Sequence, residues 1–310
     1  MRRLRSLRHL PLLSGLIPLL VALLGTAGAA GAQEGWQERP GAGHVTAVFR
    51  NPALRESSGV VVSRRQPGVL WTIDDSGNPP WLFATDTLGA DRGTFRVANA
   101  RNQDWEAIAL GPCGASDCLY IADTGDNFER RTSVRLYRVV EPDLAAKRSR
   151  LWRTGPATTI EVRYPDGPHD VESLFVDAAG DAYLVSKGLG GSVRLYRVSA
   201  SAWRSGSATA ESLGPLPIDA GRRLGRLVTD ATLAPGGREV AIRTYREIFF
   251  FQRLPDGHLR PAPGQPVCSV AGLEIQGEGV AYLEARMLVL TSEAGYGRPG
   301  TISVVRCPGG

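Results

Sequence analysis

The stretch NQDWEAIAL, Asn102–Leu110, places an acidic pair, Asp104 and Glu106, directly before a short apolar run. Similar arrangements occur four more times, as LRESSGVVV, DVESLFV, TDATL and QGEGVAYL. Measured between the markers Glu56, Glu106, Glu172, Asp230 and Glu278, the intervals are 50, 66, 58 and 48 residues. A pattern that returns at such intervals is typical of a repeat fold.

Between these markers, short runs rich in Val, Ile, Tyr and Phe alternate with clusters of Gly, Pro, Asp and Ser, which is the pattern of strands joined by turns. The runs group in fours. The heptapeptide SVRLYRV fills the third place in two successive groups, at Ser133–Val139 and Ser192–Val198, and CSVAGLEI (268–275) fills the fourth place of the fourth group. The fifth group has three runs, and a strand over His44–Arg50 would complete it.

Four strands per repeat, arranged around an axis, is the layout of a β-propeller. We therefore predict an all-β fold with five four-stranded blades, its ring closed by residues 44–50 in the last blade. A ring of six blades is the alternative.

Residues 1–32 have the three parts of a secretory signal peptide. A basic start is followed by the apolar stretch Leu10–Leu24 and by the small-residue cleavage motif AGA. A retained membrane anchor is the alternative, but the apolar stretch is short and interrupted by proline. We expect residues 33–43 to be flexible and residues 44–310, which contain no linker-like tract, to form one domain.

The net charge of +5 includes four arginines of the signal peptide, so the mature chain carries 5 − 4 = +1. A near-neutral domain lacks the concentrated basic surface that nucleic-acid binding needs. We therefore expect no contact with nucleic acid. The signal peptide predicts a secreted protein, extracellular or periplasmic, and we expect it to be a monomer that has no contact with a membrane after signal cleavage.

The four cysteines of this chain are expected to form disulfides, because secretion exposes them to an oxidising compartment. Cys113 and Cys118 flank the four-residue turn GASD, which makes a local bridge the simplest pairing. Cys268 would then pair with Cys307. A zinc site is the alternative, but the spacing does not match and no histidines lie nearby in the sequence.

In a four-stranded meander, the start of the first strand and the end of the second lie on the same face. The acidic strand starts should therefore lie beside the loops that follow the second strands, which contain DDSGN, DTGDN, SKG, RTY and SEA. Polar loops on a rigid scaffold often carry function. Carboxylates gathered around one axis require a bound cation, basic partners or retained protons.

Carboxylate and amide oxygens are the ligands that Ca²⁺ prefers, so the sequence predicts a central calcium site. The candidate metal ligands are Glu56, Asp104, Glu106, Asp123, Asn127, Asp170, Glu172, Asp230 and Glu278. The alternative is a structural role, in which each acid accepts hydrogen bonds from the neighbouring blade and from arginine.

Further polar residues of the same loops are candidates for contacting a small polar ligand: Asp75, Asp126, Arg130, Tyr245 and Glu293. The leading functional hypothesis is a metal-dependent hydrolase of small polar esters, with metal-bound water as the nucleophile. His169 is the candidate general base, and Lys187 or Arg243 would stabilise the oxyanion. The rival is a non-catalytic propeller that binds a ligand or an extracellular protein and whose acidic ring is structural.

The strings LRESSGV, IDDSGN, DWEAIA and DTGDN resemble those of secreted bacterial propellers described as WD40- or NHL-like. More distantly, the acidic strand starts are similar to those of calcium-dependent propellers of the phytase-like and gluconolactonase/paraoxonase-like families. That resemblance implies calcium near the axis and hydrolysis of phosphoesters or lactones. The positions that it assigns as ligands are Glu56, Glu106, Asp123, Asn127, Glu172 and Glu278. Those families have six blades, and the basic clusters of the phytases are absent from this sequence.

Overall fold

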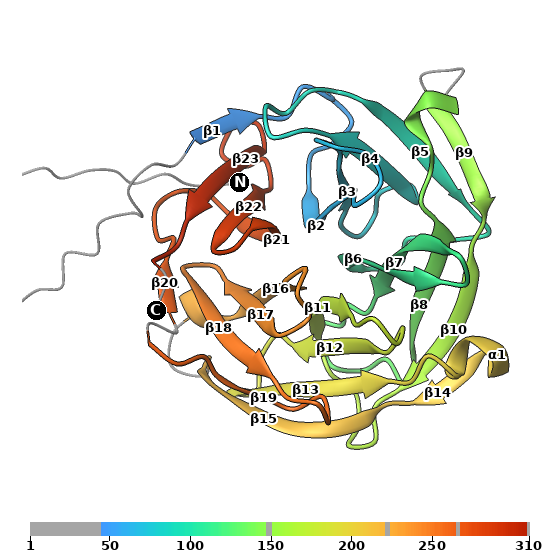
Figure 1. Cartoon of the computed structure of the whole chain (residues 1–310), viewed down its shortest axis with the longest axis vertical. Coiled ribbons are helices and arrows are strands. Elements are labelled where there is room, and N and C mark those ends of the chain that lie inside the picture. Colours follow the sequence, from blue (N-terminus) through green and yellow to red (C-terminus); the bar gives the residue numbers. More distant parts are fainter. Residues whose placement is uncertain (1–44, 147–150, 221–223, 265–266, 309–310) are drawn as a thin grey trace, which may run out of the picture. The chain divides into compact units, whose positions relative to one another are not determined.

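The computed structural model describes residues 45–146, 151–220, 224–264 and 267–308. Five sheets surround a central axis as the blades of a propeller (Figure 1). The prediction of five blades is therefore confirmed. The expected signal peptide (1–32) and flexible segment (33–43) lie outside the described residues. Among the residues that are described, no helix has the length and hydropathy needed to cross a bilayer.

Blades 1 to 3 are antiparallel meanders with their first strand innermost. Blade 1 contains β2 (Ser57–Val62), β3 (Leu70–Asp74), β4 (Trp81–Thr85) and β5 (Gly93–Ala98). Blade 2 contains β6 (Trp105–Cys113), β7 (Ser116–Asp123), β8 (Val134–Val140) and β10 (Thr158–Arg163). Blade 3 contains β11 (Val171–Val176), β12 (Ala182–Ser186), β13 (Ser192–Val198) and β15 (Glu211–Asp219). The two SVRLYRV segments form the third strands β8 and β13, as predicted.

Blade 5 is closed by the N-terminal strand. It contains β21 (Gly277–Glu284), β22 (Met287–Ser292), β23 (Thr301–Arg306) and β1 (Val45–Val48). Strand β1 pairs antiparallel with β23, with Val48 opposite Thr301, which confirms the predicted closure of the ring.

Blade 4 differs from the prediction at its outer edge. It contains β16 (Val228–Leu233), β17 (Glu239–Thr244) and β18 (Glu247–Arg253), and two three-residue strands, β19 (Leu259–Pro261) and β20 (Val267–Ser269), both pair with β18. The predicted fourth strand over 268–275 is wrong beyond Ser269. The turn that follows it contains Gly272 with a φ of 80°, a left-handed conformation that interrupts a strand.

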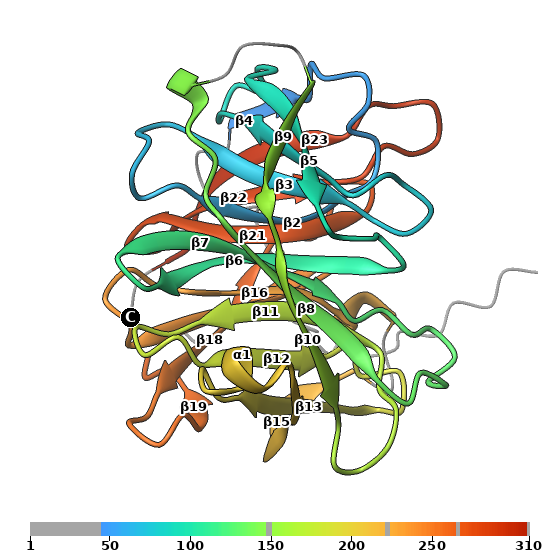
Figure 2. The same cartoon turned by 90° about the vertical axis from the view of Figure 1, so that its right-hand side faces the viewer.

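Two strands were missed by the sequence analysis, and both join neighbouring blades. Strand β9 (Leu151–Pro156) pairs in parallel with β5 of blade 1 before the chain enters β10 of blade 2. Strand β14 (Ser207–Thr209) likewise pairs with β10 before the chain enters β15. Figure 2 shows β9 and β10 passing along the outer edge of the ring. These segments are largely exposed and lack an apolar alternation, so no sequence pattern identified them. The helical segments are short: η1 (Leu144–Ala146), α1 (Ala202–Ser205) and η2 (Leu224–Arg226).

The hydrophobic core is divided into five clusters, each shared by two neighbouring blades. One cluster joins blade 2 to blade 3 through Tyr120 and Leu184, and another joins blade 5 to blade 1 through Val289 and Leu70. Both faces of the inner strands are thereby buried, as in β11, where all six residues are buried. Each blade is therefore stabilised by the blades on its two sides.

Both predicted disulfides are present. Cys113–Cys118 closes the β6–β7 hairpin, and Cys268–Cys307 joins β20 of blade 4 to the residue that follows β23 in blade 5; the Cα–Cα distance is 5.7 Å in each. The two cysteines are 5 residues apart in the sequence in the first bridge and 39 residues apart in the second. The longer loop loses more chain entropy on cross-linking of the unfolded state.

We predict that replacing Cys268 and Cys307 together by alanine lowers the free energy of unfolding by about 4 kcal/mol, and replacing Cys113 and Cys118 by about 2 kcal/mol, from the loop-length dependence of the bridge entropy. Urea denaturation of the two double variants measures both values. Equal losses would contradict a stabilisation governed by loop length.

Candidate functional site

All five inner strands share an irregularity at their start, on one face of the propeller. In blade 2, Trp105 pairs with Asp123 and Ala107 with Ala122, so Glu106 is an extra residue in the ladder. Register shifts occur at the same place in the other four blades. Such a bulge re-aims the side chain of the inserted residue.

The bulges correct the predicted alignment of the repeats. Counted from the first pair of each ladder, the residues equivalent to Glu106 are Ser58, Glu172, Thr229 and Glu278. Hydrogen bonds between blades support this register: Ser58 Oγ donates to the carbonyl oxygen of Glu106 at 2.8 Å, and Thr229 Oγ1 to that of Glu278 at 3.0 Å. The expectation of five equivalent carboxylates is therefore wrong, because two of the five positions hold hydroxyls.

The two misaligned acids lie on either side of these positions. Glu56 precedes β2 and is exposed, and its carboxylate accepts a hydrogen bond from Asn78 Nδ2 at 2.6 Å. Asp230 follows Thr229 and is fully buried, where its carboxylate accepts hydrogen bonds from the backbone N–H groups of Ala231 and Val280. Asp230 thus joins blade 4 to blade 5.

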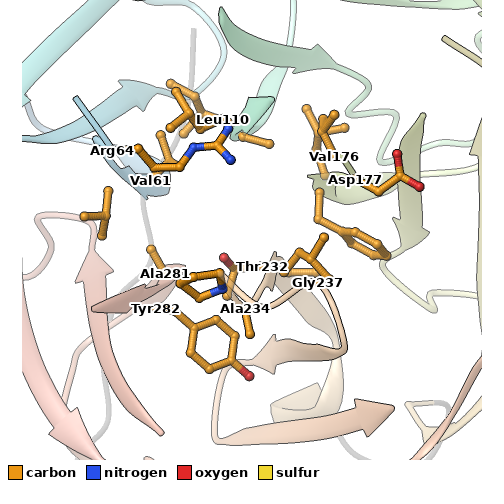
Figure 3. A pocket seen from close by; sticks show the side chains of 18 of the residues that line it. Val61, Arg64, Leu110, Val176, Asp177, Thr232, Ala234, Gly237, Ala281 and Tyr282 are labelled. Atoms are coloured by element: carbon orange, nitrogen blue, oxygen red, sulfur yellow. The ribbon is translucent and has the colours of Figure 1, made fainter. Parts of the chain in front are cut away.

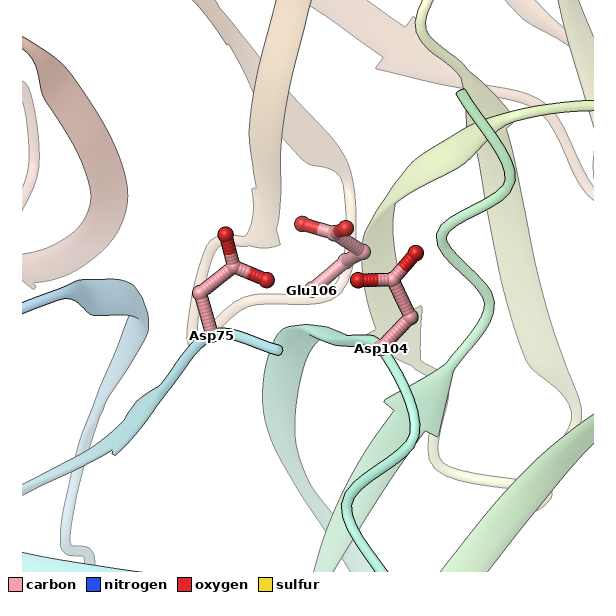
Figure 4. Close-up of side chains that lie close together, drawn as sticks. All are labelled: Asp75, Asp104 and Glu106. Atoms are coloured by element: carbon pink, nitrogen blue, oxygen red, sulfur yellow. The ribbon is translucent and has the colours of Figure 1, made fainter. Parts of the chain in front are cut away.

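The first carboxylate cluster contains Asp75, Asp104 and Glu106 (Figure 4), each with a carboxylate oxygen within 4.8 Å of the others. Asp75 comes from the β3–β4 loop of blade 1, and the other two from the start of β6. Glu106 is buried, whereas Asp75 and Asp104 are partly exposed. The cluster therefore has a buried floor and a side that faces solvent.

The second cluster shares Glu106 with the first and adds Asp170 and Glu172 of blade 3, again with carboxylate oxygens within 4.8 Å. Here a basic group is present. Lys187 Nζ lies 2.6 Å from Glu172 Oε1 and 3.6 Å from Asp170 Oδ2. Asp170 Oδ2 is buried and forms no hydrogen bond. Lys187 thus compensates this cluster only in part.

The DTGDN loop supports both clusters. The backbone N–H of Asp126 donates to Asp170 Oδ1 at 2.7 Å, and Arg131 bonds Asp123 Oδ1 at 3.0 Å and the carbonyl oxygen of Gly125 at 2.8 Å. A Cβ atom at Gly125 would lie 2.2 Å from Glu106 Oε1 and 2.5 Å from Asp104 Oδ2. Glycine is required there because two carboxylates pack directly against the backbone.

The remaining predicted residues are distributed more widely. Tyr245, Glu278 and Glu293 lie near the clusters, since their charges interact with Glu172. Asn127 and Arg130 are exposed. His169 lies 3.1 Å from Asp166 through Nε2 and packs against Tyr164 and Tyr196.

Arg243 is buried in contacts with the neighbouring blade. Its guanidinium donates to the carbonyl oxygens of Gly279 at 2.6 Å and Thr291 at 3.1 Å and pairs with Glu274. The sequence analysis missed Glu274, because it assigned this residue to a strand. Ser58 and Thr229 were not identified from the sequence either, because they carry no carboxylate and a bulge leaves no periodic signal.

Burial raises the pKa of several carboxyl groups at this face. The pKa of Glu106 lies well above its usual range because of burial and of the charges of Glu172 and Asp75. Burial, partly opposed by Lys187, raises the pKa of Glu172 to about 7. Burial and neighbouring acids raise the pKa of Asp104 to about 6 and that of Glu293 to about 7. These acids therefore resist ionising together.

Comparisons with known proteins add little to the description of the site. No family model matches the chain, and no curated protein sequence matches it. Among solved structures, the chain is similar to hydrazine synthase of Kuenenia stuttgartiensis, with 12% identity and a TM-score of 0.40 over 79% of this chain and 57% of that one. It is also similar to the Dos1 propeller, with 12% identity and a TM-score of 0.39 over 77% of this chain and 53% of that one.

The chain thus spans little more than half the length of these structures. The propeller fold is assigned from the strand pairing within the five sheets. The resemblance to WD40-, NHL-, phytase- and gluconolactonase-like propellers stays a prediction.

We predict that, without added metal, the protein becomes less stable as the pH rises from about 4 to about 7. Glu106, Glu172, Glu293 and Asp104 bind protons more tightly in the folded chain than in the unfolded chain. Their contribution to stability is complete below the unfolded pKa values near 4 and is lost as the pH passes the folded values. Thermal unfolding in a chelator should show a Tm lower by a few degrees at pH 7.5 than at pH 5.

The matched variant for this measurement is Glu293→Gln, which removes one raised pKa and should reduce the decrease in Tm. Asp86 and Asp166, whose pKa values are lowered by hydrogen bonds, titrate below this pH window. A Tm that rises between pH 5 and pH 7.5 would contradict the assignment.

Proposed function

We propose that this protein is a secreted propeller that binds a hard divalent cation, Ca²⁺ by the chemistry of its ligands, at Asp75, Asp104 and Glu106. The observation that carries the proposal is the convergence of three carboxylates without a basic group in direct contact with them. Among the described residues, no lysine or arginine forms an ion pair with any of the three. A cation would allow all three to ionise.

The donor atoms fit this assignment. All are carboxylate oxygens, and Ca²⁺ takes six to eight oxygen ligands at about 2.3–2.6 Å. Two ligands on opposite sides of such an ion are about 4.8 Å apart, and the oxygens of the cluster lie within 4.8 Å of one another. The partly exposed Asp75 and Asp104 leave room for water to complete the coordination.

Two further observations support a charged ligand at this face. Asp170 Oδ2 in the adjoining cluster is buried without a hydrogen-bond partner. The two disulfides favour an oxidising compartment, where free calcium is abundant enough for low-affinity sites.

We predict that a hundredfold excess of Ca²⁺ over Kd raises Tm by about 5–10 °C at pH 7.5, because such an excess stabilises a folded protein by about 2.7 kcal/mol. Glu106→Gln should weaken calcium binding more than about tenfold, since ligand charge sets calcium affinity. Isothermal titration calorimetry and thermal unfolding measure both effects.

The matched control is Glu278→Gln, which changes the equivalent bulge residue of blade 5 and lies outside both clusters. It should keep the calcium response. No calcium-dependent change in Tm and no bound metal would refute the proposal, and equal losses in the two variants would move the site away from Asp75, Asp104 and Glu106.

Ester hydrolysis is a second function, favoured by the partial exposure of Asp75 and Asp104. A metal held there would keep positions for water, and metal-bound water is a nucleophile for phosphoesters and lactones. Lys187, at the adjoining cluster, would supply positive charge for a developing oxyanion. The alternative is a non-catalytic calcium-binding or scaffold propeller, in which contacts such as the hydrogen bonds of Arg243 to Gly279 and Thr291 hold neighbouring blades together.

For this second function we predict calcium-dependent hydrolysis of 4-nitrophenyl phosphate or dihydrocoumarin, lost in Glu106→Gln and kept in Glu278→Gln. The measurement is the absorbance of the product at matched protein concentrations. Calcium binding without turnover of either compound would contradict the hydrolase hypothesis and favour the non-catalytic calcium-binding or scaffold propeller.

A further inference from the structure

The end of the central channel opposite the carboxylate clusters has a different chemical character. A cavity of about 300 Å³ lies there, between the final residues of the inner strands (Figure 3). All five blades contribute to its wall, through Val61, Leu110, Val176, Thr232 and Ala281. Most of the lining side chains are apolar, although polar atoms contribute nearly half of the surface, so the cavity suits a ligand with both an apolar and a polar part.

Two charged residues lie at the rim of this cavity, and they differ in how accessible they are to a ligand. Asp177 pairs with Arg253 and accepts hydrogen bonds from the backbone N–H groups of Ala179 and Asp181 at 2.9 and 3.0 Å. Arg64 has a side chain that is 56% exposed and, among the described residues, one ion pair, 2.9 Å long, with Asp117. An exposed ion pair of this kind contributes little and is easily exchanged.

We propose that this cavity is a binding site for a small amphipathic anion, an aryl or short alkyl carboxylate or sulfonate. The apolar body would lie between the strand ends, and the anionic group would pair with Arg64. The volume is at the lower end of the range of about 300–1,000 Å³ for ligand pockets, which limits the body to one or two rings or a short chain. The acidic clusters disfavour an anion at the other end of the channel, so this site is independent of the proposed calcium site.

The test compares two fluorescent probes with the same two-ring body, 5-dimethylaminonaphthalene-1-sulfonate and its neutral analogue 5-dimethylaminonaphthalene-1-sulfonamide. Both should bind the folded protein, with one site per chain. Arg64→Gln should weaken binding of the sulfonate about three- to tenfold and leave the neutral probe unchanged. The matched control is Arg163→Gln, because Arg163 is also 56% exposed and also forms one exposed ion pair, with Glu161.

Filling the cavity should abolish the binding of both probes. Thr232→Trp occupies it from β16, and Ala234→Phe does so from the rim, so that a folding defect in one variant does not prevent the test. Near-ultraviolet circular dichroism confirms that each variant is folded, and added chelator should leave probe binding unchanged. Unchanged binding in folded cavity-filled variants would overturn the site, and an equal effect of Arg64→Gln on both probes would overturn the pairing with an anion.

Discussion

The burial of both faces of every sheet is the constraint on which this structure depends. Each of the five core clusters is shared between two blades, so a blade removed from the ring would expose two apolar faces. Such a ring is stable only when the first blade also packs against the last. The pairing of β1 with β23 and the bridge between Cys268 and Cys307 both lie in the last blade or at its border, where the chain must close.

The same closure creates the acidic face. Five inner strands begin around one axis, and a bulge in each turns one side chain toward its neighbours. Because Glu106, Glu172 and Glu278 are buried there, their ionisation is costly, and burial is the largest cause of each raised pKa. Serine and threonine at the other two positions reduce the repulsion and hydrogen-bond the next blade. Lys187 partly neutralises the negative charge of the second cluster. The charge of the first cluster must be neutralised by a bound ligand or by protonation of its carboxylates.

The two ends of the channel therefore suit ligands of opposite kinds. Carboxylates gather where the inner strands begin, and apolar side chains with one available arginine gather where they end. The polarity follows from the topology, since polar loops and bulges lie at the first end and the apolar strand interiors extend to the second. A cation and an amphipathic anion could be bound at once without competing for the same groups.

The sequence alone determined the repeat, the number of blades, the closing strand and both disulfides, because these depend on local patterns of apolar runs, turns and cysteine spacing. It also identified NQDWEAIAL as part of the acidic face, and Asp104 and Glu106 do lie in a carboxylate cluster with Asp75. Only the tertiary structure decided which residues are equivalent, because a bulge changes the register without leaving a periodic signal. Ser58 and Thr229 therefore occupy the positions that the sequence pattern assigned to Glu56 and Asp230. Contacts between residues far apart in the chain, such as that of Arg243 with Glu274, are likewise visible only in the tertiary structure, because local sequence patterns do not specify them.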